Sequence, residues 1–159
     1  MTDNCVVDIK TQNRQQRGYT LFLLLLVFIA SHVDRQIVAI LQEPIRIAFD
    51  LTDTQLGVLT GFAFALFYAT LGMPMAMWAD RRNRRNLIAF SISLWSAMTV
   101  ACAAAGQYWQ LLAARIGVAV GEAGSNPPSH SIIADLYQPA ERATAMAIFG
   151  LGVNFGIMF

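Results

Sequence analysis

Four arginines are crowded into a short hydrophilic segment that separates two long apolar stretches of this sequence. The segment runs from Asp80 to Arg85 and reads DRRNRR. Arginines in a short loop between membrane-spanning helices keep that loop on the cytoplasmic side of the membrane. Because the side of one loop fixes the direction of the spans around it, this segment predicts an all-α, polytopic membrane helix bundle of defined orientation.

The composition agrees with this prediction. Hydrophobic residues make up 56% of the chain and charged residues only 13%, against about 25% charged in an ordinary soluble domain. The net charge of +1 argues against a nucleic-acid partner, which would need a basic stripe. Cys5 lies in a polar leader and Cys102 in an alanine-rich apolar segment, so neither a disulfide framework nor a metal site is indicated. We expect no cofactor.

The apolar segments predict five membrane spans, of which the chain's end interrupts the last. The uncharged run from Tyr19 to Val33 is short for a span, so its helix should continue through Asp34 and Arg35. A cleaved signal peptide is the alternative, but further spans follow and no convincing cleavage pattern is present. The predicted spans are about 19–41, 55–79, 86–105, 108–134 and 142–159, after a cytoplasmic tail at 1–18.

Two local patterns refine this layout. Residues 42–53 suit an external loop with a helical turn, and Thr52 with Gln55 forms a candidate capping box at the start of the second span. Within that span small residues recur at every fourth position and predict a face for close contact with another helix. These residues are Gly57, Gly61, Ala65 and Ala69.

The distribution of basic residues sets the predicted orientation. Arg46 is the one basic residue in a predicted external loop, whereas eight occupy predicted cytoplasmic segments. Those eight are Lys10, Arg14, Arg17, Arg81, Arg82, Arg84, Arg85 and Arg142. We therefore expect a multi-pass protein of the cell's inner (plasma) membrane, with its N-terminus in the cytoplasm and the lipid bilayer around it.

Four charged residues lie inside predicted spans, where each costs at least about 2.5–3.5 kcal/mol unless it faces a partner or a wet cavity. We expect Asp34 to pair with Arg115 and to exchange a proton as its surroundings change. A static pair that only supports helix packing is the alternative. Arg35 either turns outward or binds an anionic substrate group. Glu122 is either a second proton site or a hydrogen-bond partner of Ser125 and nearby backbone.

The fourth predicted span has two different faces. Arg115 and Glu122 are seven residues apart and fall within about 20° of each other, while three glycines lie on roughly the opposite side. The glycines are Gly117, Gly121 and Gly124. Next, Pro127 and Pro128 interrupt the helical hydrogen bonds, producing either a bend that lines a cavity or a harmless kink. We expect Ser125 and Asn126, at this break, to line the substrate cavity with Arg35.

These motifs resemble the Major Facilitator Superfamily, and within it the spinster-like group. The superfamily signature is a glycine, three residues, then Asp-Arg-x-Gly-Arg-Arg/Lys; Asp80, Arg81, Arg84 and Arg85 match it, while Ala76 and Asn83 replace its glycines. Spinster-like proteins are similar at Asp34-Arg35, at ARIGVAVGEAG and at IIADLYQPAERATAMAIF. The resemblance covers roughly residues 20–159.

The resemblance implies the N-terminal part of a transporter with proton-coupled alternating access for a small organic or lipid-like solute. In it Asp34 matches the carboxylate that exchanges a proton, Arg115 its partner, and Glu122 a glutamate lining the cavity. The loop residues Asp80, Arg81, Arg84 and Arg85 match charges that hold the two transporter halves together in one conformation.

Length and motif content set the remaining expectations. A full superfamily member has two six-helix halves with the substrate between them, so we expect a fragment that lacks its C-terminal half. An inactive fragment or non-transporting scaffold, whose charged pair only supports packing, is the alternative. Neither an HExxH nor a GxSxG motif occurs, and His32 and His130 lie on different predicted helices. We expect no catalytic residues and no enzyme activity.

Overall fold

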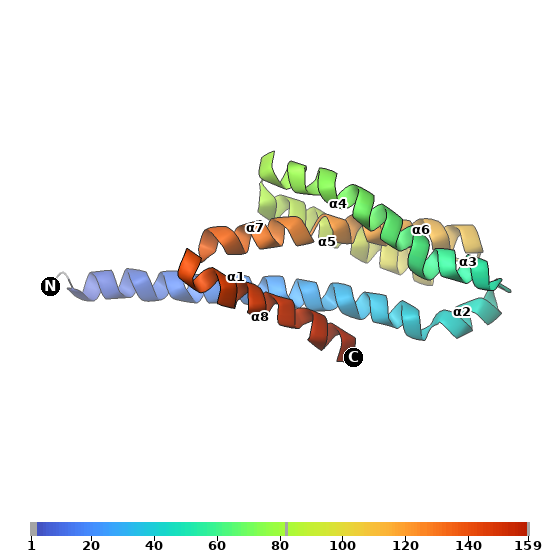
Figure 1. Cartoon of the computed structure of the whole chain (residues 1–159), viewed down its shortest axis with the longest axis horizontal. Helices are drawn as coiled ribbons and strands as arrows, with labels where there is room; N and C mark the ends of the chain where they lie inside the picture. Colours follow the sequence, from blue (N-terminus) through green and yellow to red (C-terminus); the bar gives the residue numbers. More distant parts are fainter. Residues whose placement is uncertain (1–2, 82, 159) are drawn as a thin grey trace. The chain divides into compact units, whose positions relative to one another are not determined.

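The computed structural model describes residues 3–81 and 83–158, and the side chains of residues 14–75, 77 and 83–158. Every regular element in this part of the chain is a helix, which confirms the all-α prediction (Figure 1). The elements are α1 (Asp3–Ile40), α2 (Gln42–Ala48), α3 (Asp53–Gly57), the π-helix η1 (Val58–Phe62), α4 (Ala63–Arg81), α5 (Arg84–Ala103), α6 (Tyr108–Ala123), α7 (Asn126–Leu136) and α8 (Pro139–Met158).

The chain forms two compact units. The first contains Met1–Val33 and Ser131–Phe159, and the second contains Asp34–His130. Helices α1 and α7 each contribute one part to each unit.

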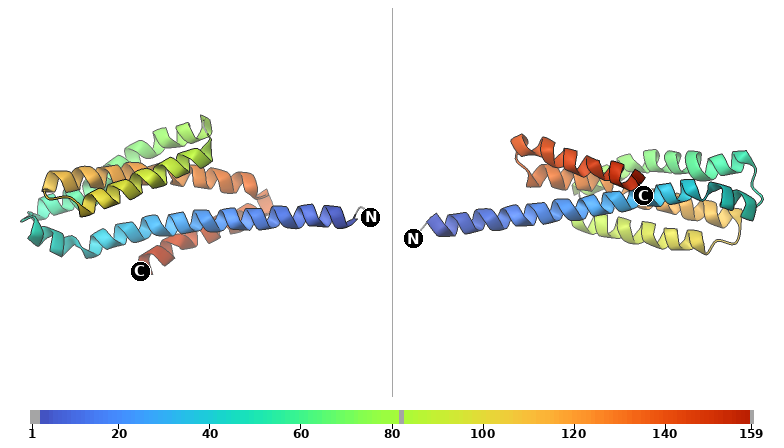
Figure 2. Two further views of the ribbon diagram at one scale, coloured as in Figure 1. Left: turned by 180° about the vertical axis from the view of Figure 1, so that it is seen from behind. Right: turned by 90° about the horizontal axis from the view of Figure 1, so that it is seen from below.

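In the first unit, α8 runs beside the first part of α1 (Figures 1 and 2). The contact is close because α8 presents glycine: a Cβ at Gly152 would lie 2.9 Å from Phe28 Cδ1, and one at Gly156 would meet His32 Cβ. The rings of Phe28 and Phe149 stack with centroids 4.4 Å apart. His32 is the residue of α1 that Gly156 on α8 approaches, so this histidine is an interface residue of the unit.

In the second unit, α6 lies against both α5 and α4 (Figure 2). A Cβ at Gly117 would lie 2.6 Å from Met98 Sδ, and one at Gly121 only 2.8 Å from the backbone nitrogen of Trp95. The glycine side of α6 is thus pressed against α5. The predicted two-sided character of this helix is confirmed.

The entry into the second predicted span has the expected cap. Gln55 N donates to Thr52 Oγ1 at 3.3 Å, and Thr52 N donates to Gln55 Oε1 at 3.0 Å. This confirms the capping box. The π-helix that follows, Val58–Phe62, was not predicted.

The small-residue face of the second span does not contact another helix among the described residues. A Cβ at Gly57 or Gly61 would have no described atom within 4 Å, and Ala65 and Ala69 are exposed. The predicted close contact is not made by any described helix, because a small-residue stripe permits close approach without requiring it. The rings of Phe64 and Tyr68 on α4 face the interior of the unit instead.

Two boundaries differ from the prediction. Helix α1 runs from Asp3 to Ile40, so residues 3–18 of the predicted cytoplasmic tail are helical as well. The fourth predicted span is two helices, because α6 ends at Ala123 and α7 starts at Asn126. Pro127 and Pro128 then occupy the first turn of α7, where a missing N–H leaves no helical hydrogen bond unmade. The predicted interruption of this span is present.

Three described helical segments are long and apolar enough to cross a membrane: Arg14–Ile40, Asp53–Met75 and Arg84–Ala103. They coincide with the first three predicted spans. Large apolar side chains on them are exposed, among them Phe22, Phe62 and Phe90. A helix facing lipid needs such a surface, because lipid tails are as apolar as leucine. The fourth and fifth spans stay predictions.

Candidate functional site

The residues expected to carry function gather within the second unit, around the end of α1. Arg115 Nη1 on α6 lies 3.5 Å from Asp34 Oδ2 on α1, as the sequence predicted. The other carboxylate oxygen, Oδ1, accepts a hydrogen bond of 3.2 Å from Thr99 Oγ1 on α5. Asp34 is therefore held by two partners on two different helices.

A second ion pair lies beside the first. Arg35 Nη2 is 2.6 Å from Glu122 Oε2, and Arg35 Nε donates to the same oxygen at 2.8 Å. The Glu122 side chain is 1% exposed and that of Arg35 is 32% exposed. One of the two interpretations made Glu122 a hydrogen-bond partner of Ser125. Ser125 Oγ does donate to Glu122 at 2.9 Å, but to its backbone carbonyl oxygen and not to its carboxylate.

Aromatic rings of α4 cover both guanidinium groups. The Arg35 guanidinium carbon is 4.9 Å from the ring centroids of both Phe64 and Tyr68, and that of Arg115 is 5.2 Å from Phe64. Such cation–π contacts contribute about 0.5–2 kcal/mol each, more when desolvated. The two arginines are therefore stabilised by ring faces as well as by carboxylates.

The Asp34–Arg115 pair opens on a cavity of about 320 Å³. Thr99 and Cys102, one turn apart on α5, line the cavity together with the pair. Apolar residues form most of the remaining wall, including Leu59 and Leu111 from the core of this unit. Asp34 therefore has an apolar cavity on one side and a guanidinium on the other.

Each pair keeps one buried polar atom without a hydrogen-bond partner among the described residues. These atoms are Arg115 Nε and Glu122 Oε1. At the break between α6 and α7, Asn126 Nδ2 donates to the Tyr68 hydroxyl at 3.0 Å, while Asn126 Oδ1 is likewise unpaired. Unmet bonding capacity thus occurs at several points around the two ion pairs.

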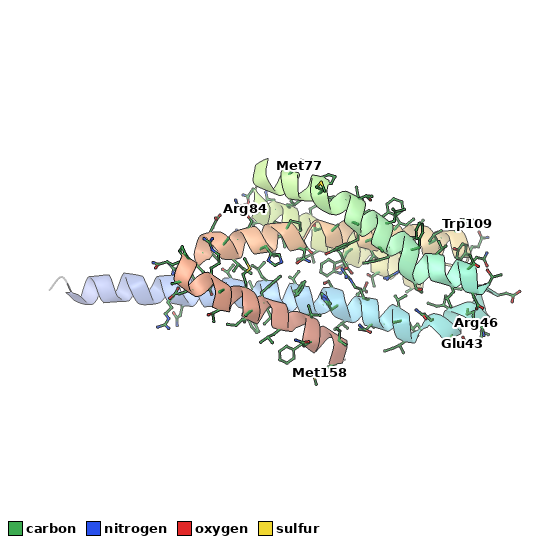
Figure 3. The ribbon with its side chains drawn as sticks, viewed as in Figure 1. Glu43, Arg46, Met77, Arg84, Trp109 and Met158 are labelled. Carbon is green, nitrogen blue, oxygen red and sulfur yellow. The ribbon has the colours of Figure 1, made fainter. Side chains whose placement is uncertain are left out.

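The predicted switch loop is only partly described. The side chains of Asp80 and Arg81 lie outside the described residues. Arg84 and Arg85 begin α5, and Asn83 caps the helix by accepting a hydrogen bond from Arg85 N at 3.1 Å. Arg84 lies at the end of the second unit opposite to Trp109, Glu43 and Arg46 (Figure 3).

Sequence reasoning missed the Arg35–Glu122 pair, the rings of Phe64 and Tyr68 beside it, and Thr99 as the second partner of Asp34. A signal was present for the aromatic pair: Phe64 and Tyr68 are four residues apart and therefore share a helix face. For Thr99 no such signal exists, since a lone threonine in an apolar helix usually bonds its own backbone.

The fold and this site define the class of protein: a multi-pass helical membrane protein that keeps charged pairs inside its helix bundle. The family model of the Major Facilitator Superfamily matches residues 23–159. An MFS-type efflux pump of Mycolicibacterium smegmatis is 37% identical over 131 residues, covering 82% of this chain and 30% of the pump. A probable L-galactonate transporter of Escherichia coli is 27% identical over 151 residues, covering 94% of this chain and 33% of that protein.

A solved structure is also similar. The crystal structure of a bacterial homologue of the human lysosomal transporter Spinster, inward-facing and unoccupied, has a TM-score of 0.84 and 47% identity. It covers 88% of this chain and 29% of the solved chain. The chain therefore belongs to the Major Facilitator Superfamily, a family of transporters, and its resemblance to the spinster-like group is confirmed. It spans about 30% of the length of these relatives.

Proposed function

We propose that this protein takes part in secondary active transport of a small organic or amphipathic solute, coupled to protons, with Asp34 as the group that exchanges the proton. The observation that carries the proposal is the Asp34–Arg115 pair, set inside apolar helices and lining a cavity. A charged group at such a site usually serves an ion or substrate pathway.

The geometry favours Asp34 over Glu122 for this role. The contact of 3.5 Å between Asp34 and Arg115 is longer than the 2.7–2.9 Å typical of strong charge-assisted hydrogen bonds, so Asp34 is held less tightly by its cation than Glu122 is. Its side chain is 13% exposed and meets the cavity. Glu122 is held more tightly by Arg35, and we assign it a supporting role as a second proton site through its unpaired Oε1.

Arg35 is the best candidate to meet an anionic group of the solute. Its guanidinium is the more exposed of the two, and the rings of Phe64 and Tyr68 fix its plane. A solute carboxylate or phosphate would compete with Glu122 for this fork of donors. Ser125 and Asn126, at the break before α7, are proposed to line the same solute pathway.

The orientation and the loop belong to the same proposal. We place the N-terminus in the cytoplasm and the protein in the cell's inner membrane, because the arginine-rich segment would then face inward. In this arrangement Asp80, Arg81, Arg84 and Arg85 act as a conformational switch against the remainder of the transporter. The proton, the solute and that remainder are the proposed partners.

The test is proton flux driven by solute in liposomes that enclose a pH-sensitive dye, with L-galactonate and a lysophospholipid as probes. Asp34→Asn keeps the size of the side chain and removes its charge change, so coupled flux should be lost. Arg115→Ala should also reduce it. Glu43→Gln, which removes an exposed carboxylate on α2, is the matched control and should leave the flux unchanged.

The scaffold alternative makes the opposite prediction. If the charged pair only supports packing, Asp34→Asn would lower the unfolding free energy and leave the proton flux at the wild-type rate. Flux that persists unchanged in Asp34→Asn would remove proton coupling through this residue and leave the family assignment intact.

A further inference from the structure

The first unit holds a second cavity, of about 670 Å³, which the proposed transport function does not use. It is lined by residues 14–21 of α1, by Tyr137 and Gln138 before α8, and by the first three turns of α8. The volume falls within the range of sites that bind small molecules, roughly 300–1,000 Å³.

The α1 wall of the cavity changes from basic to apolar along one helix face. Arg14, Arg17, Gly18 and Leu21 all line it, and spacings of three and four residues place them on the same side of the helix. A Cβ on Gly18 would meet no described atom within 4 Å, so the wall is open between the arginines and the buried Leu21.

The α8 wall changes in the same direction. Glu141 and Thr144 lie on it near the start of the helix, and Ala145 and Ile148 continue the face toward the middle. Ala145 is buried and Ile148 is partly exposed. Both walls are therefore polar at one end and apolar at the other.

This change of polarity falls at the predicted membrane boundary. The uncharged run of α1 starts at Tyr19, two residues after Arg17. The Tyr137 hydroxyl donates to the backbone oxygen of Arg17 at 3.3 Å and joins the turn before α8 to this level of α1. The cavity's polar end thus lies where lipid headgroups are found, and its apolar end where acyl chains begin.

We propose that this cavity binds the headgroup of an anionic glycerophospholipid. Its phosphate contacts the guanidinium groups of Arg14 and Arg17, and the first carbons of its acyl chains contact Leu21, Ala145 and Ile148. Planar guanidinium groups match phosphate oxygens in pairs of hydrogen bonds. Two arginines against one glutamate, Glu141, give the lining a net positive charge that complements the lipid phosphate.

A free phosphate ion fits this site less well than a lipid does. It would use the arginine end and leave the apolar half of both walls without a contact. A zwitterionic lipid would fill the apolar half, but its cationic group would oppose the net charge of the lining. The gradient of polarity along both walls therefore selects a ligand that is anionic at one end and apolar at the other.

The test is lipid binding to the purified protein in phosphatidylcholine nanodiscs, measured by native mass spectrometry with dioctanoyl phosphatidylglycerol as probe. Arg14→Gln and Arg17→Gln should each weaken binding about fivefold, since one basic group near an anionic lipid surface contributes about that factor. Glu141→Gln should tighten binding, because it removes the opposing charge. Arg46→Gln removes the same charge outside the cavity and should have no effect.

A second variant separates the cavity from general charge. Gly18→Leu fills the open part of the α1 wall, keeps both guanidinium groups and favours the helix, so it should weaken binding while the thermal unfolding midpoint is kept. Equal binding by Gly18→Leu and the wild type, or equal weakening by Arg46→Gln, would overturn the proposal. Displacement of the probe by inorganic phosphate at the same concentration would assign the site to the free anion instead.

Discussion

The two ion pairs of the second unit each join a guanidinium to a carboxylate that is largely hidden from solvent, but they are held differently. Arg35 and Glu122 are in close contact, whereas Asp34 divides its oxygens between Arg115 and Thr99. A short pair around a 1% exposed carboxylate depends on its cation, since an unpaired charge at that depth is strongly unfavourable.

This difference leads to a prediction for Arg35→Ala. Removing the cation leaves Glu122 buried and unpaired, which should lower the unfolding free energy by about 3 kcal/mol. The double variant Arg35→Met with Glu122→Gln removes both charges and should recover most of that loss. Denaturation in mixed micelles, followed by helical content, measures both. A double variant no more stable than Arg35→Ala would show that packing, and not the unpaired charge, is responsible.

An exposed pair on α2 gives a contrasting prediction. Hydrogen bonds from Arg46, at 2.7 and 3.0 Å, lower the pKa of Glu43 below its ordinary value of 4.5. Because the pKa is lowered in the folded state, the pair stabilises α2 above the unfolded pKa, and this stabilisation is lost as pH falls through the lowered value. A carboxyl titration of Glu43 by NMR should have its midpoint below 4.5, and Arg46→Ala should move it upward. An unchanged midpoint in Arg46→Ala would contradict this attribution.

At the scale of the helices, close approach depends on where a glycine meets backbone. Gly121 on α6 faces the backbone of α5, at Trp95 N and Ser91 O. Backbone atoms cannot rotate away as a side chain can, so this contact sets how closely α5 and α6 lie. Gly72 on α4 has no described atom near its missing Cβ.

The matched pair Gly121→Ala and Gly72→Ala tests this account. The first places a methyl group 2.7 Å from Trp95 Cβ and should destabilise the protein by about 1–3 kcal/mol through overpacking. The second should be neutral or slightly stabilising, since alanine favours a helix more than glycine does. The measurement is the thermal unfolding midpoint of each variant compared with that of the wild type. Equal midpoints would mean that α6 can move away from α5 at no cost.

At the scale of the whole molecule, the ends of the second unit differ in charge. Arg84 lies at one end, and Glu43, Arg46 and Trp109 lie at the other (Figure 3). An arginine-rich end facing the cytoplasm places α2 outside the cell. This orientation is a proposal that can be tested without any substrate.

Single cysteines in a background with Cys5→Ser and Cys102→Ser provide the measurement. A membrane-impermeant maleimide should label Glu43→Cys on intact cells, whereas Arg85→Cys should be labelled only after the membrane is opened. Both positions are exposed in the structure, so burial does not explain a difference. The reverse pattern would invert the proposed topology, and labelling of both on intact cells would show that the two positions face the same side.

The sequence by itself determined the helical class, the three helices long and apolar enough to cross a membrane, the capping box and the pairing of Asp34 with Arg115. The helices and the cap follow from local properties, namely the length of an apolar segment and the chemistry of a capping residue. The ion pair follows because a charged side chain within an apolar segment needs an opposite charge, and few residues can supply one. The glycine face of α6 was also predictable, because helix geometry fixes the angle around the axis between the glycines and the charged residues.

Only the tertiary structure decided which partners meet around that pair. Arg35 could have reached an anion, lipid or another helix, and its contact with Glu122 depends on how α1 and α6 are placed in the second unit. The same holds for Phe64 and Tyr68, which face the arginines, while Gly57 and Gly61 on the same span do not form the expected contact. The residues on a helix face limit which groups can pack against it, and the positions of the other helices determine which group does.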